Sequence, residues 1–179
     1  MPNPLGDSRW PQPKRWYSRE QLLKPPNVLL MHWLQLPGSL TAALSQLAKG
    51  DLKVKVIFEG WHKPTLAERQ QLGLPHDRLV WIREVELIGQ GQPWVHARSL
   101  LPARSLNAAG QRLTRLGNRS LGSVLFKHPA LKRRGVEFSQ LNHPAGKIWA
   151  RRSRLEVHGH AVFVAEAFLP ALLAYYASR

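Results

Sequence analysis

The stretch KIWARRSRLEVHGHAVFVAEAFLP, residues 147–170, predicts two strands joined at His158-Gly159-His160. The second strand, over 161–169, is apolar at both odd and even positions, which is typical of a strand that is buried on both faces. Glu166 is the exception, a carboxylate in the middle of this apolar run. An unpartnered buried charge is costly, so the sequence predicts that Glu166 is protonated or faces a cation or hydrogen-bond donor.

A second charged residue occupies an interior position in the strand predicted over 79–88. Alternation places Arg83 on one face with Leu79, Trp81, Val85 and Leu87, as it places Glu166 with Val162, Val164 and Phe168. An acid and a base that both point from interior positions of a sheet indicate a closed polar pocket.

Each of these two residues has a structural and a functional interpretation. Arg83 is either the structural partner of Glu84, Glu86 or Glu166, or a clamp on a ligand carboxylate, for which a guanidinium group has the right geometry. Glu166 is either a solvated carboxylate at a strand edge or bulge, or a residue matched to a ligand hydroxyl and to proton transfer.

The composition limits the class of protein. A chain of 179 residues suits one domain with a sizeable core, and a formal charge of +15 favours polyanions or small acidic ligands. The absence of cysteine excludes disulfides and thiolate metal sites and fits a reducing cytoplasm. The first ten residues contain no apolar segment of a signal peptide, and no apolar stretch is long enough to span a membrane.

Known catalytic and metal-binding motifs are missing from the sequence. The eight histidines show no metal spacing, and there is no phosphate-binding glycine loop, nucleophile elbow or HExxH. Alternation turns Arg151 inward and leaves Arg152 and Arg154 on a solvated, partly ion-paired face, with nucleic-acid contact as the alternative. Aromatic residues are not interleaved with the basic ones in a stacking pattern, so a nucleic-acid partner is not expected.

The order of elements predicts an α+β fold. Residues 1–26 are expected to form a proline-rich, basic and flexible arm ahead of a domain over 27–179. Trp10, Trp16 or Tyr17 is expected to attach this arm to the domain. Helices are expected over 27–36, 40–49, 65–72, 105–116, 120–126 and 171–179, and strands over 51–59, 79–88, 93–101, 136–141 and the two halves of 147–170. In 51–59, alternation turns Leu52, Val54, Val56 and Phe58 the same way. Hairpin signals at 89–92 and 158–160 imply antiparallel pairing.

Four segments, in this order, resemble the chorismate lyase family of bacteria. They are Trp81-Ile82-Arg83-Glu84 with Gln92-Pro93-Trp94, LGNRSLG at 116–122 with Leu125-Phe126, WARRSRL at 149–155, and EAFLP at 166–170. The resemblance extends from about Trp33 to Pro170 and is expected to leave out the arm before Asn27 and the tail after Pro170.

The resemblance implies a single antiparallel sheet of about six strands, with helices packed around it and helical flaps over a buried ligand site. It implies conversion of chorismate to 4-hydroxybenzoate and pyruvate, the first step toward the ubiquinone ring, by a cytoplasmic monomer without metal or organic cofactor. A closed site for an aromatic acid also predicts slow product release and product inhibition.

The resemblance also assigns roles to individual residues. Arg83 takes the position of the carboxylate-binding arginine, and Glu166 that of the essential glutamate near the phenolic oxygen of the product, as acid or as base. Leu121 and Leu40 take positions where backbone groups contact the ligand. The enolpyruvyl carboxylate of chorismate needs a further basic residue, for which Arg151 is the candidate.

One alternative function and one further role of the charge remain open. Effector-sensing domains of some transcription regulators are similar in fold to this lyase, so an aromatic-acid sensor is the alternative; such regulators carry a helix-turn-helix domain first, and about 26 residues precede the first expected helix here. The charge of +15 also fits a weak association with an anionic membrane surface.

Overall fold

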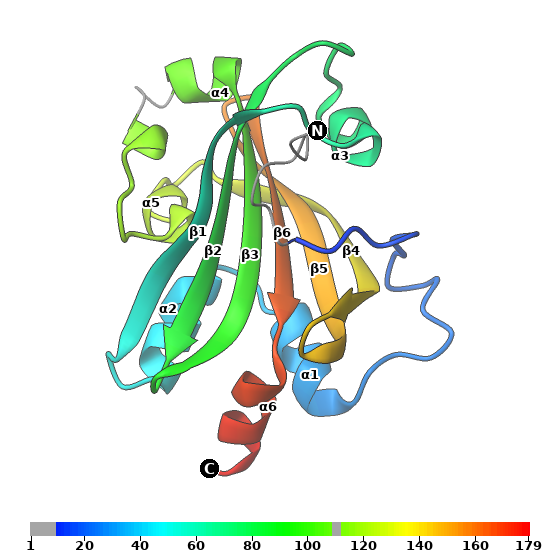
Figure 1. Ribbon diagram of the computed structural model, residues 1–179, viewed down its shortest axis with the longest axis vertical. Coiled ribbons are helices and arrows are strands. Elements are labelled where there is room, and N and C mark those ends of the chain that lie inside the picture. The colour runs from blue at the N-terminus through cyan, green and yellow to red at the C-terminus, as the bar shows by residue number, and fades with distance from the viewer. Residues whose placement is uncertain (1–9, 109–111) are drawn as a thin grey trace.

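A six-stranded antiparallel sheet forms the centre of the protein, with the strand order β1-β2-β3-β6-β5-β4 (Figure 1). The computed structural model describes residues 10–108 and 112–179. The strands are β1 (Leu52–His62), β2 (Val80–Gly89), β3 (Gln92–Pro102), β4 (Lys132–His143), β5 (Gly146–Val157) and β6 (His160–Phe168). The helices are α1 (Val28–Leu34), α2 (Leu40–Leu47), α3 (Leu66–Leu72), α4 (Ala103–Ala108), the 3-10 turn η1 (Arg112–Thr114), α5 (Leu121–Leu125) and α6 (Pro170–Ala177). The predicted α+β class with a single antiparallel sheet is confirmed.

Local sequence signals account for most helix boundaries. The side chains of Asn27, Ser39, Thr65 and Ser120 each accept a hydrogen bond from a backbone N–H of the first turn of α1, α2, α3 and α5. Thr65 and Glu68 form a capping box, and α3 ends at Gly73, whose φ of 61° is left-handed.

Two predicted elements need correction. The strand expected over 136–141 begins at Lys132, so the basic run 132–134 lies inside β4. In place of the helix expected over 105–116, the structure has the short helix α4 before residue 109 and the 3-10 turn η1 after residue 111. The middle of the expected helix, 109–111, lies outside the described residues. Leu79 precedes the first residue of β2 and is 47% exposed, outside the face it was expected to share.

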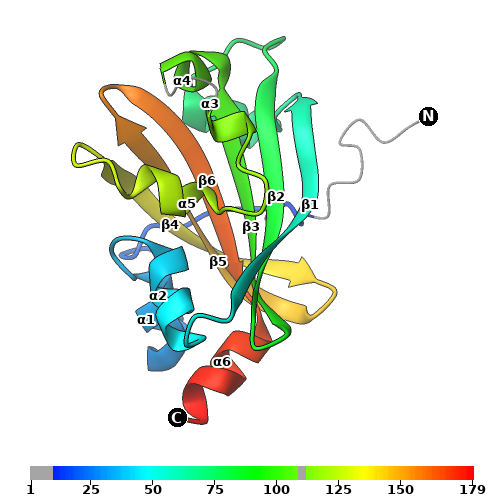
Figure 2. The ribbon, with the colours of Figure 1, turned by 90° about the vertical axis from the view of Figure 1, so that its left-hand side faces the viewer.

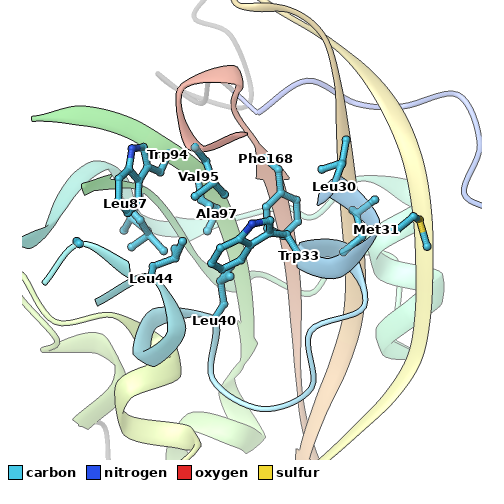
Figure 3. Packing of buried hydrophobic residues seen from close by; sticks show 14 of the residues in the cluster. Leu30, Met31, Trp33, Leu40, Leu44, Leu87, Trp94, Val95, Ala97 and Phe168 are labelled. Atoms are coloured by element: carbon cyan, nitrogen blue, oxygen red, sulfur yellow. The ribbon is translucent and has the colours of Figure 1, made fainter. Parts of the chain in front are cut away.

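Both faces of the sheet are covered, which explains why nearly all residues of the central strands β3 and β6 are buried. We call the face under α1, α2 and α5 the cavity face; these helices lie together at the left of Figure 2. Trp33 of α1, Leu40 and Leu44 of α2, and Phe168 of β6 pack together on this face (Figure 3).

The opposite face, called the far face, is covered partly by the N-terminal segment. Trp10 is 6% exposed and belongs to the same cluster as Phe163 and Ala165 of β6. Tyr17 forms a bridge with Phe138 of β4, and the guanidinium of Arg152 lies 4.9 Å from the ring centroid of Trp16. The three aromatic residues expected to hold the segment therefore all contact the sheet.

This cover corrects the expected environment of Arg152. Its side chain was predicted to be solvated, but the residue is 7% exposed, below Trp16 and in an ion pair with Glu137 at 2.6 Å. The ion pair was expected, whereas the burial follows from the contact with the N-terminal segment. Arg154 is partly exposed, as expected, and its guanidinium lies 4.0 Å from Glu156.

A bulge in β1 changes the side-chain alternation. The pairing with β2 shifts between Val56 and Phe58, so that Val56 pairs with Val85 but Phe58 pairs with Glu84. One extra residue moves the following side chains to the other face. Phe58 consequently packs with the far-face cluster, not with Leu52, Val54 and Val56 as predicted, and Glu59 becomes the cross-strand neighbour of Arg83.

Candidate functional site

A cavity lies on the cavity face, between the sheet and the helices α2 and α5. Its volume is ≈ 40 Å³, which is large enough for more than one water molecule. Its walls are formed by Leu40, Thr41, Arg83, Val85, Leu87, Ala97, Ser99, Ser120, Leu121, Gly122, Phe126, Leu155, Val164 and Glu166. Four of the five predicted site residues, Leu40, Arg83, Leu121 and Glu166, therefore line one cavity.

Strand register brings the two predicted charges to the same face. Glu166 pairs with Ala97 of β3 on one side and with Arg151 of β5 on the other. Arg83 pairs with Ser99, two residues along β3 from Ala97. Because directly paired residues and residues two apart along a strand share a face, both charges point into the cavity. Arg83 on β2 and Glu166 on β6 are separated by β3, so their strands are roughly 10 Å apart.

Arg83 is held from three directions. Its guanidinium pairs with Glu59 of β1 and donates through Nη2 to the carbonyl oxygens of Gly117 at 2.5 Å and Arg119 at 3.1 Å. Neither Glu84, Glu86 nor Glu166 is its partner, contrary to the structural alternatives in the sequence analysis. Its Nε is buried without a hydrogen-bond partner. The side chain is thus fixed while one donor at the cavity is left for a ligand.

Glu166 lies between two arginines. Arg151 donates through Nε to Glu166 at 2.5 Å, and Nη1 of Arg133 lies 3.9 Å from the same carboxylate oxygen. Arg151 is 1% exposed, and its Nη1 also donates to the carbonyl of Leu36 at 2.9 Å. The inward orientation predicted for Arg151 is confirmed, but its side chain supports Glu166 and does not line the cavity.

The helices α2 and α5, which cover the cavity, both reach it with their first residue. Leu40 and Leu121 are the first residues of α2 and α5, each directly after a capping serine. The backbone N–H groups of a first helical turn have no acceptor inside the helix. The Thr41 hydroxyl donates to the Ser120 hydroxyl at 2.8 Å, so a side-chain hydrogen bond joins the two helices over the cavity.

Two charged residues that contact Arg83 or Glu166 in this site, Glu59 and Arg133, were not predicted as site residues. Glu59 reaches Arg83 because of the bulge in β1, and no sequence pattern marked the bulge. Arg133 was included only in a basic patch, and its role depends on the pairing of β4 with β5. Burial lowers the pKa of Arg133, with the charge of Glu166 raising it and that of Arg151 lowering it.

The far face holds a second buried charge cluster. Arg98 of β3 donates to Glu68 through Nε and Nη2, at 2.7 and 3.2 Å, and to Glu84 through Nη1 at 2.6 Å. Burial lowers the pKa of Arg98, but hydrogen bonds and charges from Glu68 and Glu84 raise it above its ordinary value overall. All three guanidinium nitrogens of Arg98 bond to protein carboxylates, so the charge of Arg98 is satisfied internally, while Nε2 of His96 lies 3.7 Å from Glu84 without a hydrogen bond.

Across residues 10–108 and 112–179, no group of three or more His, Asp or Glu side chains is placed to hold a metal ion. No helix in the same part of the chain is long and apolar enough to cross a membrane.

Comparison with known proteins links the chain to one enzyme family. The family model described as chorismate lyase matches residues 10–177. The chain is 41% identical over 164 residues to the probable chorismate pyruvate-lyase of Pseudomonas syringae pv. syringae, covering 88% of each protein. It is 36% identical over 156 residues to the chorismate pyruvate-lyase of Pectobacterium atrosepticum, covering 86% of this chain and 85% of that protein. The match starts before Asn27 and passes Pro170, so the expected limits of the resemblance were too narrow.

Solved structures with a similar fold include regulator domains. The effector domain of PhnF from Mycobacterium smegmatis aligns with a TM-score of 0.56 at 15% identity, over 75% of this chain and 90% of that one. The ligand-binding domain of a putative GntR-family regulator from Bordetella bronchiseptica aligns with a TM-score of 0.53 at 11% identity, over 66% and 86%. At such identities the likeness shows the fold alone, and it agrees with the expected similarity to sensor domains.

Proposed function

Because the chain belongs to the chorismate lyase family, we propose that it converts chorismate to 4-hydroxybenzoate and pyruvate, as a cytoplasmic monomer that supplies ubiquinone synthesis. The observation that supports this function most is that Arg83 and Glu166 both line one cavity between the sheet and the covering helices. A six-membered ring with a carboxylate at one end and an oxygen at the other fits between an arginine and a glutamate.

We assign the ring carboxylate to the Arg83 end of the cavity. The unpartnered Nε of Arg83 donates to it, and the backbone N–H of Leu121, at the start of α5, donates a second hydrogen bond. Leu40, at the start of α2, offers the corresponding backbone contact from the other helix. These contacts hold the ring in one orientation, so that the reacting carbons face Glu166.

Glu166 acts as a base in this proposal. Arg151 holds the Glu166 carboxylate in place through Nε, and a carboxylate at this position can take up a proton from the ring. Glu166 takes the proton from C4, the electron pair of that C–H bond forms the third ring double bond, and the C3–O bond breaks toward the departing oxygen. Protonation of the released enolpyruvate at its methylene carbon gives pyruvate. Aromatisation supplies the driving force, so the reaction as written needs no cofactor.

The net charge of +15 supports this substrate, since a dianion is attracted to a cationic protein. We assign any membrane association to the same charge, as a weak contact with anionic lipid surfaces, and we expect no nucleic-acid partner.

The test is an absorbance assay with chorismate, with products identified by chromatography. We expect equal amounts of 4-hydroxybenzoate and pyruvate, and loss of turnover in folded Arg83→Ala and Glu166→Ala variants. Tight binding of 4-hydroxybenzoate without turnover would favour the sensor alternative, and neither binding nor turnover would contradict both functions.

A further inference from the structure

Chorismate carries a second carboxylate, on the enolpyruvyl group, and the residues assigned so far leave it without a partner. Arg151, the candidate from the sequence, is committed elsewhere, because its Nε pairs with Glu166 and its Nη1 lies within 3.4 Å of the carbonyl oxygens of Trp33, Leu34 and Leu36. Only Nη2 of Arg151 has no hydrogen-bond partner, so Arg151 does not offer the parallel pair of donors that binds a carboxylate through both oxygens. The cation for this carboxylate must therefore be another residue.

Arg133 of β4 lies on the cavity face, one strand beyond the cavity wall. It is the direct cross-strand partner of Leu155, which lines the cavity, and such partners share a face. Its guanidinium lies 5.4 Å from the ring centroid of Phe126, another wall residue, and its Nη1 is 3.9 Å from Glu166. Arg133 thus extends the polar end of the cavity beside Glu166.

One side of the Arg133 guanidinium is hydrogen-bonded within the protein, and the other side is available to a ligand. Nη1 donates to the Ser153 hydroxyl at 2.7 Å, whereas Nη2 makes only a long contact of 3.4 Å with the Gly38 carbonyl and Nε is buried without a partner. Nε–H and the neighbouring Nη2–H form the parallel pair of donors that binds a carboxylate through both oxygens. An anion at this edge would also offset the cost of burying the charge.

We propose that the Nε–Nη2 edge of Arg133 is the subsite for the enolpyruvyl carboxylate, and that it distinguishes substrate from product. The inference rests on the proposed function, which places C4 of the ring at Glu166. C3 is bonded to C4, so its ether substituent leaves the ring beside Glu166, where Arg133 lies. After the reaction this carboxylate departs with pyruvate, and 4-hydroxybenzoate retains only the contacts near Arg83 and Glu166.

The test compares two ligands that differ by one carboxylate, 3-carboxymethoxy-4-hydroxybenzoate and 3-methoxy-4-hydroxybenzoate. Calorimetric titration of the wild-type protein should give tighter binding of the carboxymethoxy compound. In Arg133→Gln that compound should bind roughly 10- to 100-fold more weakly, the size expected for lost charge-assisted hydrogen bonds, while binding of the methoxy compound and of 4-hydroxybenzoate changes less than about threefold. Arg133→Lys should restore part of the preference.

Arg134→Gln is the matched control, because Arg134 is the next residue, is exposed and loses the same charge. It should leave the preference unchanged. The proposal is overturned if Arg133→Gln weakens all three ligands in parallel, which marks a structural role, or if the preference survives the substitution. These titrations need no turnover, so they test the subsite separately from the lyase assignment. A wild-type protein that binds both ligands with the predicted preference but does not convert chorismate would refute the lyase assignment and would still support the carboxylate subsite.

Discussion

Each face of the sheet buries a cluster of arginine and glutamate, and the two clusters differ in how fully they are satisfied. On the far face, every guanidinium nitrogen of Arg98 bonds to Glu68 or Glu84, and Trp10 lies nearby against His96 at 5.2 Å between ring centroids. On the cavity face, Arg83, Arg133 and Arg151 each retain one buried nitrogen without a hydrogen-bond partner.

This difference separates stabilising charges from binding charges. A satisfied buried network gains nothing from a ligand, whereas unsatisfied donors beside a cavity cost free energy until an anion occupies it. We therefore expect the far-face cluster to contribute to the fold, and we propose that the cavity-face cluster contributes affinity for a substrate with two carboxylates.

The largest effect on stability is expected from Arg98→Met. Removing one partner of a buried ion pair leaves Glu68 and Glu84 with uncompensated charge, and this costs about 3–5 kcal/mol of unfolding free energy. Urea unfolding measures the loss, with the exposed Arg78→Met as control, for which a change below about 0.5 kcal/mol is expected. A loss below about 1 kcal/mol in Arg98→Met would mean that the far-face cluster does not stabilise the fold.

A smaller change in binding is expected from Arg83→Gln. The lost charge-assisted hydrogen bond should weaken binding of 4-hydroxybenzoate by about 1.5–3 kcal/mol, or roughly 10- to 100-fold in Kd, measured by calorimetry. Arg78→Gln should leave Kd unchanged. If Arg83→Gln bound the product as tightly as the wild-type protein does, the ring carboxylate would have to lie elsewhere.

Thr41→Val tests the connection between the helices over the cavity. Loss of the hydrogen bond to Ser120 should destabilise the closed arrangement by about 0.5–1.5 kcal/mol, so that 4-hydroxybenzoate dissociates about 2- to 10-fold faster in stopped-flow measurements. Ser178→Ala removes a hydroxyl far from the cavity and should not change the rate. An unchanged rate in Thr41→Val would show that this hydrogen bond does not hold the site closed.

The smallest expected effect is on how the free energy of unfolding changes with pH, through His143 on the far face. Burial lowers the pKa of His143, as does the nearby His96, while Glu86 raises it. A lowered folded-state pKa means that the unfolded chain binds the proton first, so stability should fall as pH drops below about 6.5 and level off below the folded pKa. His143→Gln should flatten this slope in urea unfolding between pH 5 and 7. Exposed His76→Gln is the control, and an equal flattening there would exclude His143 as the cause.

Much of this arrangement follows from sequence periodicity. The run of apolar residues on both sides of Glu166 in β6 predicted a strand covered on both faces, which identified Glu166 as a buried charge, and the alternation of β2 placed Arg83 on a buried face. The starts of α2, α3 and α5 were predicted to within one residue. These signals are local, so one sequence is sufficient to find them.

Features that depend on distant segments were not predictable in the same way. The bulge in β1 exchanges the faces of Phe58 and Glu59 without a residue type that marks it, and the partner of Arg83 was missed for that reason. Arg152 was expected in solvent because nothing local showed that Trp16 would cover it. Arg133 is one of three consecutive basic residues, and only the pairing with Leu155 distinguishes it from its neighbours.

The most direct test of the division between the two clusters is kcat/KM for chorismate in Glu166→Gln and Glu84→Gln, measured at a temperature where both variants are folded. Each substitution removes one buried carboxylate, on the cavity face and on the far face respectively. We predict that Glu166→Gln loses about 10²- to 10⁴-fold, the range for a lost general base, and that Glu84→Gln is less stable but as active as the wild-type protein per folded molecule. Equal losses in both variants, or full activity in Glu166→Gln, would contradict the account.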